Sequence, residues 1–303
     1  MPEPSQVHID AALTNVSVAY KNAHCVADVI APPVAVRKQS DKYFIYDAER
    51  EVLRASDDRR APGAEANAVD YALTAGAYFC EDHALESVIP DEERENADPA
   101  IQVDIDRAEF LTDKIDLNKE IELASVILDG GLVPGETLEG DDRWDDPDSD
   151  PVAAVEARKS TIQAAAQVVP NTLVLPYETY AAVRMHPKVV DRVQYVRLGV
   201  ATAEVLAELF DVERVVVPRA QKNTASLGQT ASMSYVWGKN AVLCYVPPRA
   251  GLKTVALAYT FLWTAAPGSV SGRLVEVWRE DRRKSDVLRV EKYYDQKLSL
   301  IHI

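Results

Sequence analysis

The sequence predicts an α+β protein that combines one long helix, an α/β unit and a strand-rich C-terminal third. Three observations lead to this fold class. An apolar pattern of helical period runs over residues 98–130, helices and short strands alternate over residues 151–217, and five strand-like segments follow. The chain has 303 residues, 47% apolar and 27% charged, which suits one large domain or two interleaved smaller ones.

The first 40 residues have few side chains that could form a core. Val16, Val18 and Tyr20 alternate with small or polar residues, as in an extended strand, and Pro32 and Pro33 then stiffen the chain. An isolated arm of this kind buries little surface of its own. We therefore expect it either to stay mobile or to lie across a neighbouring subunit.

Two strands separated by a charged segment are expected next. Residues 43–47 are aromatic and branched, and residues 71–80 supply a returning strand. The segment between them, residues 48–70, is rich in charge and contains Pro62 and Gly63, with too few apolar residues for a core. Its composition fits a protruding hairpin and a disordered surface loop equally well.

One long helix is predicted for residues 99–129. Asp98 and Pro99 provide an N-cap and a proline at the first helical position, and Gly130 follows the last turn. About 30 residues at 1.5 Å each give a length of about 45 Å. The apolar residues form one stripe, namely Val103, Phe110, Leu117, Ile121, Ala124 and Leu128. Because no second helix of this length is predicted, we expect the stripe to pack against a sheet.

The segment after this helix, residues 135–150, is a loop dense in carboxylates, so a calcium site has to be considered. An EF-hand register starting at Asp141 would place Asp146 where a glycine is required and Val152 where a glutamate is required. We therefore favour a solvated acidic turn, which ends where Asp150 and Pro151 begin a helix.

The remainder of the chain is expected to form an α/β unit followed by strands. After a helix to about residue 169, we expect a strand at 172–175, short helices over 178–196 and 201–210, and a strand at 214–217. Further strands are expected at 235–237, 241–245, 254–263, 274–279 and 287–294. The last two are separated by polar residues and should form a hairpin that faces partly to water.

No residue pattern points to catalysis, a cofactor or a metal site. The sequence has no glycine-rich phosphate loop, its five histidines are scattered, and Cys25, Cys80 and Cys244 form no close pair. The serines between Gly268 and Gly272 lead into a strand, which favours a turn over a nucleophile elbow. We therefore expect a protein that is not an enzyme, with no catalytic residues, cofactor or metal.

Charge and hydropathy exclude two further classes of partner. The formal net charge of −15 has the wrong sign for sequence-independent binding of nucleic acid. No apolar run approaches the roughly 18 residues of a membrane helix, and the first residues lack the features of a signal peptide. We expect synthesis in the cytosol and no membrane contact.

Several segments occur in an order that resembles the axial domain of tailed-bacteriophage major capsid proteins, which share the Hong Kong 97-type fold. They are residues 170–176 (Pro-Asn-Thr-Leu-Val-Leu-Pro), His186 with Pro187, residues 206–212, residues 215–220, residues 236–239 (Val-Trp-Gly-Lys) and residues 243–247. Each fragment alone could occur in any α/β domain, so the order and spacing carry the resemblance. The predicted arm, charged loop and long helix also fit this family.

This resemblance implies a division of the chain and a function. The parts would be an N-terminal arm (1–40), an extended loop hairpin (41–80), a peripheral domain (81–150 and 265–303) with a spine helix (99–129), and an axial domain (151–264). The function would be that of a major capsid protein, self-assembling through hexamers and pentamers into an icosahedral shell around double-stranded DNA. It would be assembled in the bacterial cytoplasm and reside in the virion capsid.

The resemblance also suggests which residues meet between subunits, and which partners the chain needs. Charged residues of the extended loop are the candidates, namely Arg50, Arg54, Asp57, Asp58, Arg59, Arg60 and Glu65. The family prototype crosslinks its shell through a lysine on this loop, but this chain has no lysine between Lys42 and Lys114. Because the chain lacks the scaffolding segment with which some relatives begin, we expect a separate scaffolding protein, together with a portal. A decoration protein is left open.

Two alternatives to a capsid protein are considered. An encapsulin, which is a bacterial compartment of the same fold, usually begins with a helix, whereas residues 7–20 alternate as a strand would. A soluble metal-dependent enzyme using the acidic loop, residues 136–150, would need the ligand spacing that this loop lacks.

Overall fold

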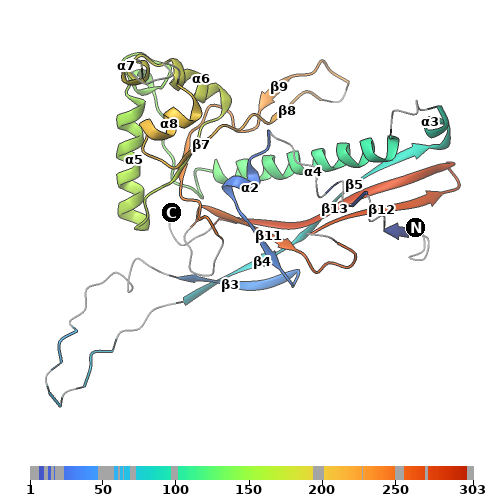
Figure 1. Cartoon of the computed structure of the whole chain (residues 1–303), viewed down its shortest axis with the longest axis horizontal. Helices are drawn as coiled ribbons and strands as arrows, with labels where there is room; N and C mark the ends of the chain where they lie inside the picture. Colours follow the sequence, from blue (N-terminus) through green and yellow to red (C-terminus); the bar gives the residue numbers. More distant parts are fainter. Residues whose placement is uncertain are drawn as a thin grey trace.

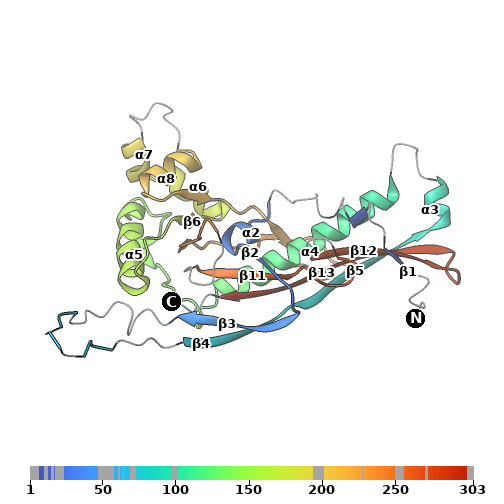
Figure 2. The ribbon, with the colours of Figure 1, turned by 60° about the horizontal axis from the view of Figure 1, so that its bottom comes forward.

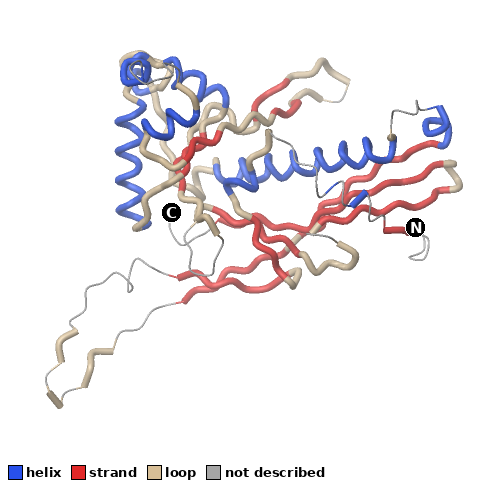
Figure 3. Tube along the Cα trace, viewed as in Figure 1, coloured by secondary structure: helices blue, strands red, loops and turns tan. Residues whose placement is uncertain are grey.

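The computed structural model describes residues 7–9, 13–14, 17, 24–46, 58–60, 62–63, 65–68, 73–96, 102–193, 201–226, 228–249, 256–269 and 272–298. The body is a long mixed sheet with one long helix along it, and a smaller α/β unit stands at one end (Figure 1). A two-stranded ribbon leaves the body on the side of the sheet away from that helix. Figure 3 separates the helices from the strands of these parts.

The long sheet has six strands. Five lie in the order β1 (Val7–Ile9), β12 (Arg273–Glu280), β13 (Ser285–Leu298), β11 (Ala258–Trp263) and β2 (Pro33–Val36), and β5 (Glu81–Pro90) also pairs with β13. Of these pairings, β11 with β2 is parallel and the others are antiparallel. The predicted C-terminal hairpin is confirmed as β12 and β13. β13 extends four residues beyond its predicted end because that end pairs with β11.

The long helix α4 (Val103–Ile127) packs against β13 and β5, which confirms that it faces a sheet (Figure 2). Its predicted start is wrong, because Gln102 is the N-cap and has a non-helical backbone; Asp98 and Pro99 lie outside the described residues. The predicted stripe is also partly wrong, since Phe110 is 51% exposed and Leu128 is exposed. The buried face is Ala108, Leu111, Thr112, Ile115, Lys119, Glu120, Leu123, Ala124 and Ile127.

The α/β unit has the predicted order of elements. It contains α5 (Pro151–Ala166), β6 (Thr172–Val174), α6 (Tyr177–Met185), α7 (Pro187–Val193), α8 (Ala203–Leu209), β7 (Arg214–Val216) and β10 (Val242–Cys244). Its sheet has the order β10-β6-β7, with β6 and β7 parallel. The predicted start of α5 is confirmed, because the Asp150 carboxylate accepts hydrogen bonds from the backbone N–H groups of Val152 and Ala153 ahead of Pro151.

Shorter elements complete the described fold. They are α2 (Ala27–Ile30), α3 (Asp91–Asn96), the 3-10 turn η3 (Gly140–Asp142), and the antiparallel pair β8 (Gln221–Asn223) and β9 (Met233–Tyr235). The strand predicted at 235–237 lies two residues earlier, because Val236 and Trp237 leave the β8–β9 pair and are buried in the core that joins α4 to the α/β unit.

Two predicted boundaries differ from the observed pairing. The boundary after residue 264 assigns β11 to the axial domain, whereas β11 pairs with β13 and β2 in the long sheet. The first 40 residues were expected to form a separate arm, yet β1, α2 and β2 all pack on the body of their own subunit. Both differences arise from contacts between residues far apart in the sequence, which local residue patterns do not predict.

Candidate assembly surfaces

The ribbon is formed by β3 (Ser40–Tyr46) and β4 (Leu73–Phe79), which pair in register from Ser40 with Phe79 to Tyr46 with Leu73. Both predicted strands are confirmed. Figures 1 and 2 show the ribbon on the side of the long sheet away from α4, running toward the end of the body where the α/β unit stands. Ser40, Lys42 and Phe79 are exposed, so the ribbon offers a surface that its own subunit does not cover.

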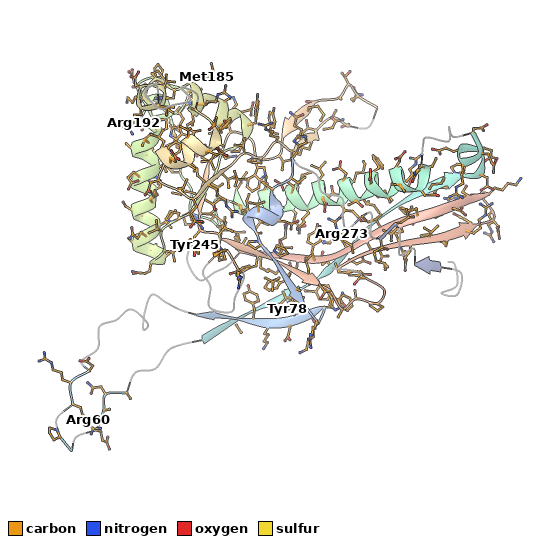
Figure 4. The ribbon with its side chains drawn as sticks, in the orientation of Figure 1. Arg60, Tyr78, Met185, Arg192, Tyr245 and Arg273 are labelled. Atoms are coloured by element: carbon orange, nitrogen blue, oxygen red, sulfur yellow. The ribbon has the colours of Figure 1, made fainter. Side chains whose placement is uncertain are left out.

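The root of the ribbon is fixed to the body by specific contacts. The Phe79 backbone N–H donates to the Asp295 carboxylate at 2.9 Å, and the ring of Tyr78, labelled in Figure 4, stacks on Phe261 with 4.6 Å between centroids. The Cys80 N–H donates to the Gln39 carbonyl at 2.8 Å. These contacts hold the direction in which the ribbon leaves the body.

Four of the seven charged residues predicted to meet between subunits can be placed. Asp58, Arg59, Arg60 and Glu65 are exposed, and Figure 4 shows Arg60 far from the body. The other three, Arg50, Arg54 and Asp57, lie outside the described residues. The exposed position of these four is compatible with a contact to a second subunit, and that contact stays a prediction.

The described part of the N-terminal segment lies on its own subunit, contrary to expectation. Leu13 is buried against α4 and β12, and the Thr14 hydroxyl accepts a hydrogen bond from the Val275 N–H at 3.2 Å. Ser17 shares a hydrogen bond with the Thr112 hydroxyl at 2.7 Å and has helical backbone, not the predicted strand. Small hydroxyl residues fit here because they satisfy buried polar groups of α4 and β12.

Glu120 joins three parts of the molecule. It is fully buried, and one carboxylate oxygen accepts hydrogen bonds from the backbone N–H groups of Val26 and Ala27 at 2.9 and 2.6 Å. The other oxygen accepts from the Trp237 indole N–H at 2.6 Å. Burial raises the pKa of Glu120, while these donors oppose that shift. The carboxylate thus links α2, α4 and the segment after β9.

A second carboxylate on α4, that of Asp116, connects the helix to the sheet. It accepts two hydrogen bonds from Arg273 at 2.8 and 2.7 Å, and one from Lys292 at 2.8 Å. Arg273 also donates to the Ser17 carbonyl, and Lys119 pairs with Asp28. Burial, with the neighbouring charge of Lys119, lowers the pKa of Lys292 to about 8. This cluster could not be predicted from the local sequence, because charged residues in a helix predict an exposed face.

The acidic loop, residues 136–150, is held at the C-terminal end of α6. The His186 Nδ1 accepts a hydrogen bond from the Lys188 backbone N–H, so in the neutral ring Nε2 carries the proton and donates to the Asp146 carbonyl at 2.9 Å. The Lys188 ammonium donates to the Asp148 carbonyl at 2.6 Å. His186, one of the residues on which the resemblance rests, therefore has a structural role.

Neither a metal centre nor a membrane span emerges from the part of the chain that the structure describes. Within it, no three His, Cys, Asp or Glu side chains are grouped so that they could hold a metal ion, and this includes the acidic loop. The same part of the chain holds no helix of the length and hydropathy needed to cross a membrane.

Comparisons with known proteins give a consistent set of relatives, although no family model matches the sequence. The chain is 27% identical over 254 residues to the major capsid protein of Burkholderia phage BcepMu, covering 80% of this chain and 78% of that protein. It is 29% identical over 243 residues to the major capsid protein of Pseudomonas phage JBD67, covering 78% and 77%.

Similar solved structures are also found. A phage-related protein from Bordetella bronchiseptica is similar with a TM-score of 0.74 and 26% sequence identity, over 96% of this chain and 94% of that chain. The mature capsid of bacteriophage PhiM1 is similar with a TM-score of 0.51 and 11% identity, over 92% and 85%. The second likeness concerns the fold alone.

Proposed function

We propose that this chain, a homologue of phage major capsid proteins with the Hong Kong 97-type capsid fold, is the shell-forming subunit of a phage head. The observation that carries the proposal is the ribbon of β3 and β4. Its root is fixed to the body, while the described residues between its two strands are exposed. A single soluble subunit gains little from such a ribbon, whereas a subunit in a shell can lay it on a neighbour.

The details of assembly and the partners in this proposal are those that the resemblance to phage major capsid proteins implies. The subunits would form hexamers and pentamers that close into an icosahedral shell around double-stranded DNA, after assembly in the bacterial cytoplasm. A separate scaffolding protein and a portal would be needed. The net charge of −15 supports a wall that encloses DNA without binding it tightly. The similarity to structural proteins supports a chain without catalytic activity.

We propose the following division of labour within the subunit. The hairpin (41–80) reaches the neighbour, the peripheral domain (81–150 and 265–303) with α4 forms the rigid body, and the axial domain (151–264) lies around the symmetry axes. β11 (Ala258–Trp263) falls within the range 151–264 but is assigned to the peripheral domain, because it pairs with β13. Intersubunit contacts of Asp58, Arg59, Arg60 and Glu65, together with Arg50, Arg54 and Asp57, belong to this proposal.

The experiment is to express the chain alone and with a candidate scaffolding protein, and to measure particle mass by light scattering and shape by negative-stain microscopy. Closed shells, tubes, or rings of five or six subunits are expected. A stable monomer or dimer under all conditions would contradict the proposed function.

A further inference from the structure

Acidic residues are missing from a long stretch of this acidic chain. The sequence contains 48 Asp and Glu among 303 residues, yet none lies between Glu213 and Glu276, where the average frequency would give about ten. The same stretch contains seven basic residues. By contrast, the acidic loop, residues 136–150, contains eight acidic residues and Arg143 as its one basic residue. Opposite charges are therefore concentrated in two separate parts of the chain.

Part of the acid-free stretch forms a surface at the N-terminal end of α6. Tyr177, the first residue of α6, has its ring 5.8 Å from the Tyr235 ring, and the Arg219 guanidinium lies 5.6 Å from the Tyr177 ring. The Thr179 hydroxyl donates to the Asn240 carbonyl at 3.1 Å, which places the turn containing Lys239 beside the helix. We name this surface the basic patch and define it as Tyr177, Arg219, Met233, Tyr235 and Lys239.

The basic patch is open to a partner. Tyr177 is 41% exposed and Met233 is 58% exposed, and Arg219 and Lys239 are also exposed. Within the described part of the chain, neither of these two cations forms an ion pair. Exposed tyrosine, methionine and arginine together are typical of the centre of a protein interface.

The acidic loop lies at the opposite end of the same helix. His186 and Lys188, just beyond the C-terminus of α6, bind the carbonyls of Asp146 and Asp148. Because α6 has nine residues, its two ends are about 12 Å apart. Figure 1 shows α7 on one side of α6 and the β8–β9 pair on the other. The loop and the patch of one subunit therefore face in different directions.

We propose that the acidic loop of one copy of this chain docks on the basic patch of the next copy. This inference rests on the proposed function. A contact between two different surfaces of identical subunits is heterologous, and repetition of such a contact closes a ring. The exposed carboxylates of Asp141 and Asp142 complement the exposed cations of Arg219 and Lys239. Complementary charges of this kind fix the orientation of the subunits and speed their encounter.

A second copy is favoured over DNA as the occupant of the basic patch. Sequence-independent binding of DNA needs many phosphate contacts along a basic stripe, whereas this patch has two exposed cations beside an exposed tyrosine and an exposed methionine. The matching acidic surface is present on the same chain. DNA binding is therefore treated as a competing outcome of the test.

The test is a charge exchange in the full chain. One variant carries Asp141→Lys and Asp142→Lys, a second carries Arg219→Glu and Lys239→Glu, and a third combines all four substitutions. A control, Glu92→Lys with Glu95→Lys, makes the same charge change as the first variant on exposed residues of α3. Thermal unfolding of unassembled subunits checks that each variant folds, and the assembled fraction is measured by sedimentation velocity.

Each two-residue variant is expected to need about tenfold more subunit than the wild type for the same assembled fraction, which is an effect of about 1.4 kcal/mol. The four-residue variant should return close to the wild-type value, because it restores opposite charges across the contact. Normal assembly of both two-residue variants would overturn the inference, and so would a combined variant no better than either. Normal assembly of the second variant with lost binding of a short DNA duplex, measured in the same sedimentation experiments, would assign the patch to DNA instead. Failure of the wild type to assemble would contradict the proposed function itself.

Discussion

The ribbon and the layer of α4 on the long sheet use charged residues in opposite ways. Between the two strands of the ribbon, Arg59 and Arg60 are exposed, whereas Lys119 and Glu120 of α4 are buried, with Lys119 paired to Asp28 and Glu120 accepting a hydrogen bond from the Trp237 indole N–H. Exposed ion pairs contribute about 0–1 kcal/mol, but removing one partner from a buried pair costs about 3–5 kcal/mol. Folding of the subunit therefore depends on the charges in the layer, whereas the exposed charges between β3 and β4 contribute little to it.

The largest effect is expected from Glu120→Ala. This substitution leaves the N–H groups of Val26 and Ala27 and the Trp237 indole without their acceptor, and each buried donor left unsatisfied costs about 1–3 kcal/mol. We expect a loss of about 4 kcal/mol in the free energy of unfolding, measured by urea denaturation. Asn118→Ala, at an exposed position of the same helix, is the control and should change it by less than about 0.5 kcal/mol. Equal effects of the two substitutions would refute the role of Glu120.

A smaller effect is expected from Lys292, which should make the free energy of unfolding depend on pH. Its pKa is lowered from 10.5 to about 8 in the folded subunit, so between these values the unfolded chain binds more protons than the folded one. The free energy of unfolding contributed by this group therefore rises with pH above about 8 and is constant below it. By pH 9.5 the gain should reach about 2 kcal/mol.

The measurement compares urea denaturation of the wild type with that of Lys292→Met between pH 7 and 9.5. The difference between the two proteins isolates Lys292 from the thiols, because Cys25, Cys80 and Cys244 are present in both. A difference that stays constant over this range would show that the lysine does not titrate there.

The smallest effect on the stability of the subunit is expected from Arg59→Glu with Arg60→Glu. This double substitution should change assembly only. Both residues are exposed, so the free energy of unfolding should change by less than about 0.5 kcal/mol. If the ribbon touches a neighbour, removing a few exposed ion pairs from each subunit should raise the concentration needed for assembly by about tenfold. Light scattering at graded concentrations measures this. Unchanged assembly together with unchanged stability would remove these two residues from the proposed interface.

Much of the fold was predictable from the sequence because it depends on local chemistry. Asp150 and Pro151 begin α5 as predicted, since a cap and a first-turn proline need only neighbouring residues. Alternating branched residues predicted β12 and β13, and the ordered segments of residues 170–247 led to the family. Both the fold class and the resemblance are confirmed by the comparisons.

The candidate surfaces were predictable to a lesser degree. Charge density and a paucity of apolar residues indicated the ribbon, and carboxylate density indicated the acidic loop. The basic patch was missed, because its residues come from α6, β9 and two separate loops. The absence of Asp and Glu between residues 213 and 276 was the sequence signal that could have found it.

Local residue patterns were enough to predict the fold class, the order of the elements and the excess of negative charge. Long-range contacts in the folded chain fix which face of α4 is buried, where the described N-terminal residues lie, and that β11 belongs to the long sheet. One cause accounts for all three. Lys119 and Glu120 are buried because partners from distant parts of the chain satisfy them, and β11 is placed by β2 and β13. The local pattern of polar and apolar residues does not predict such partners.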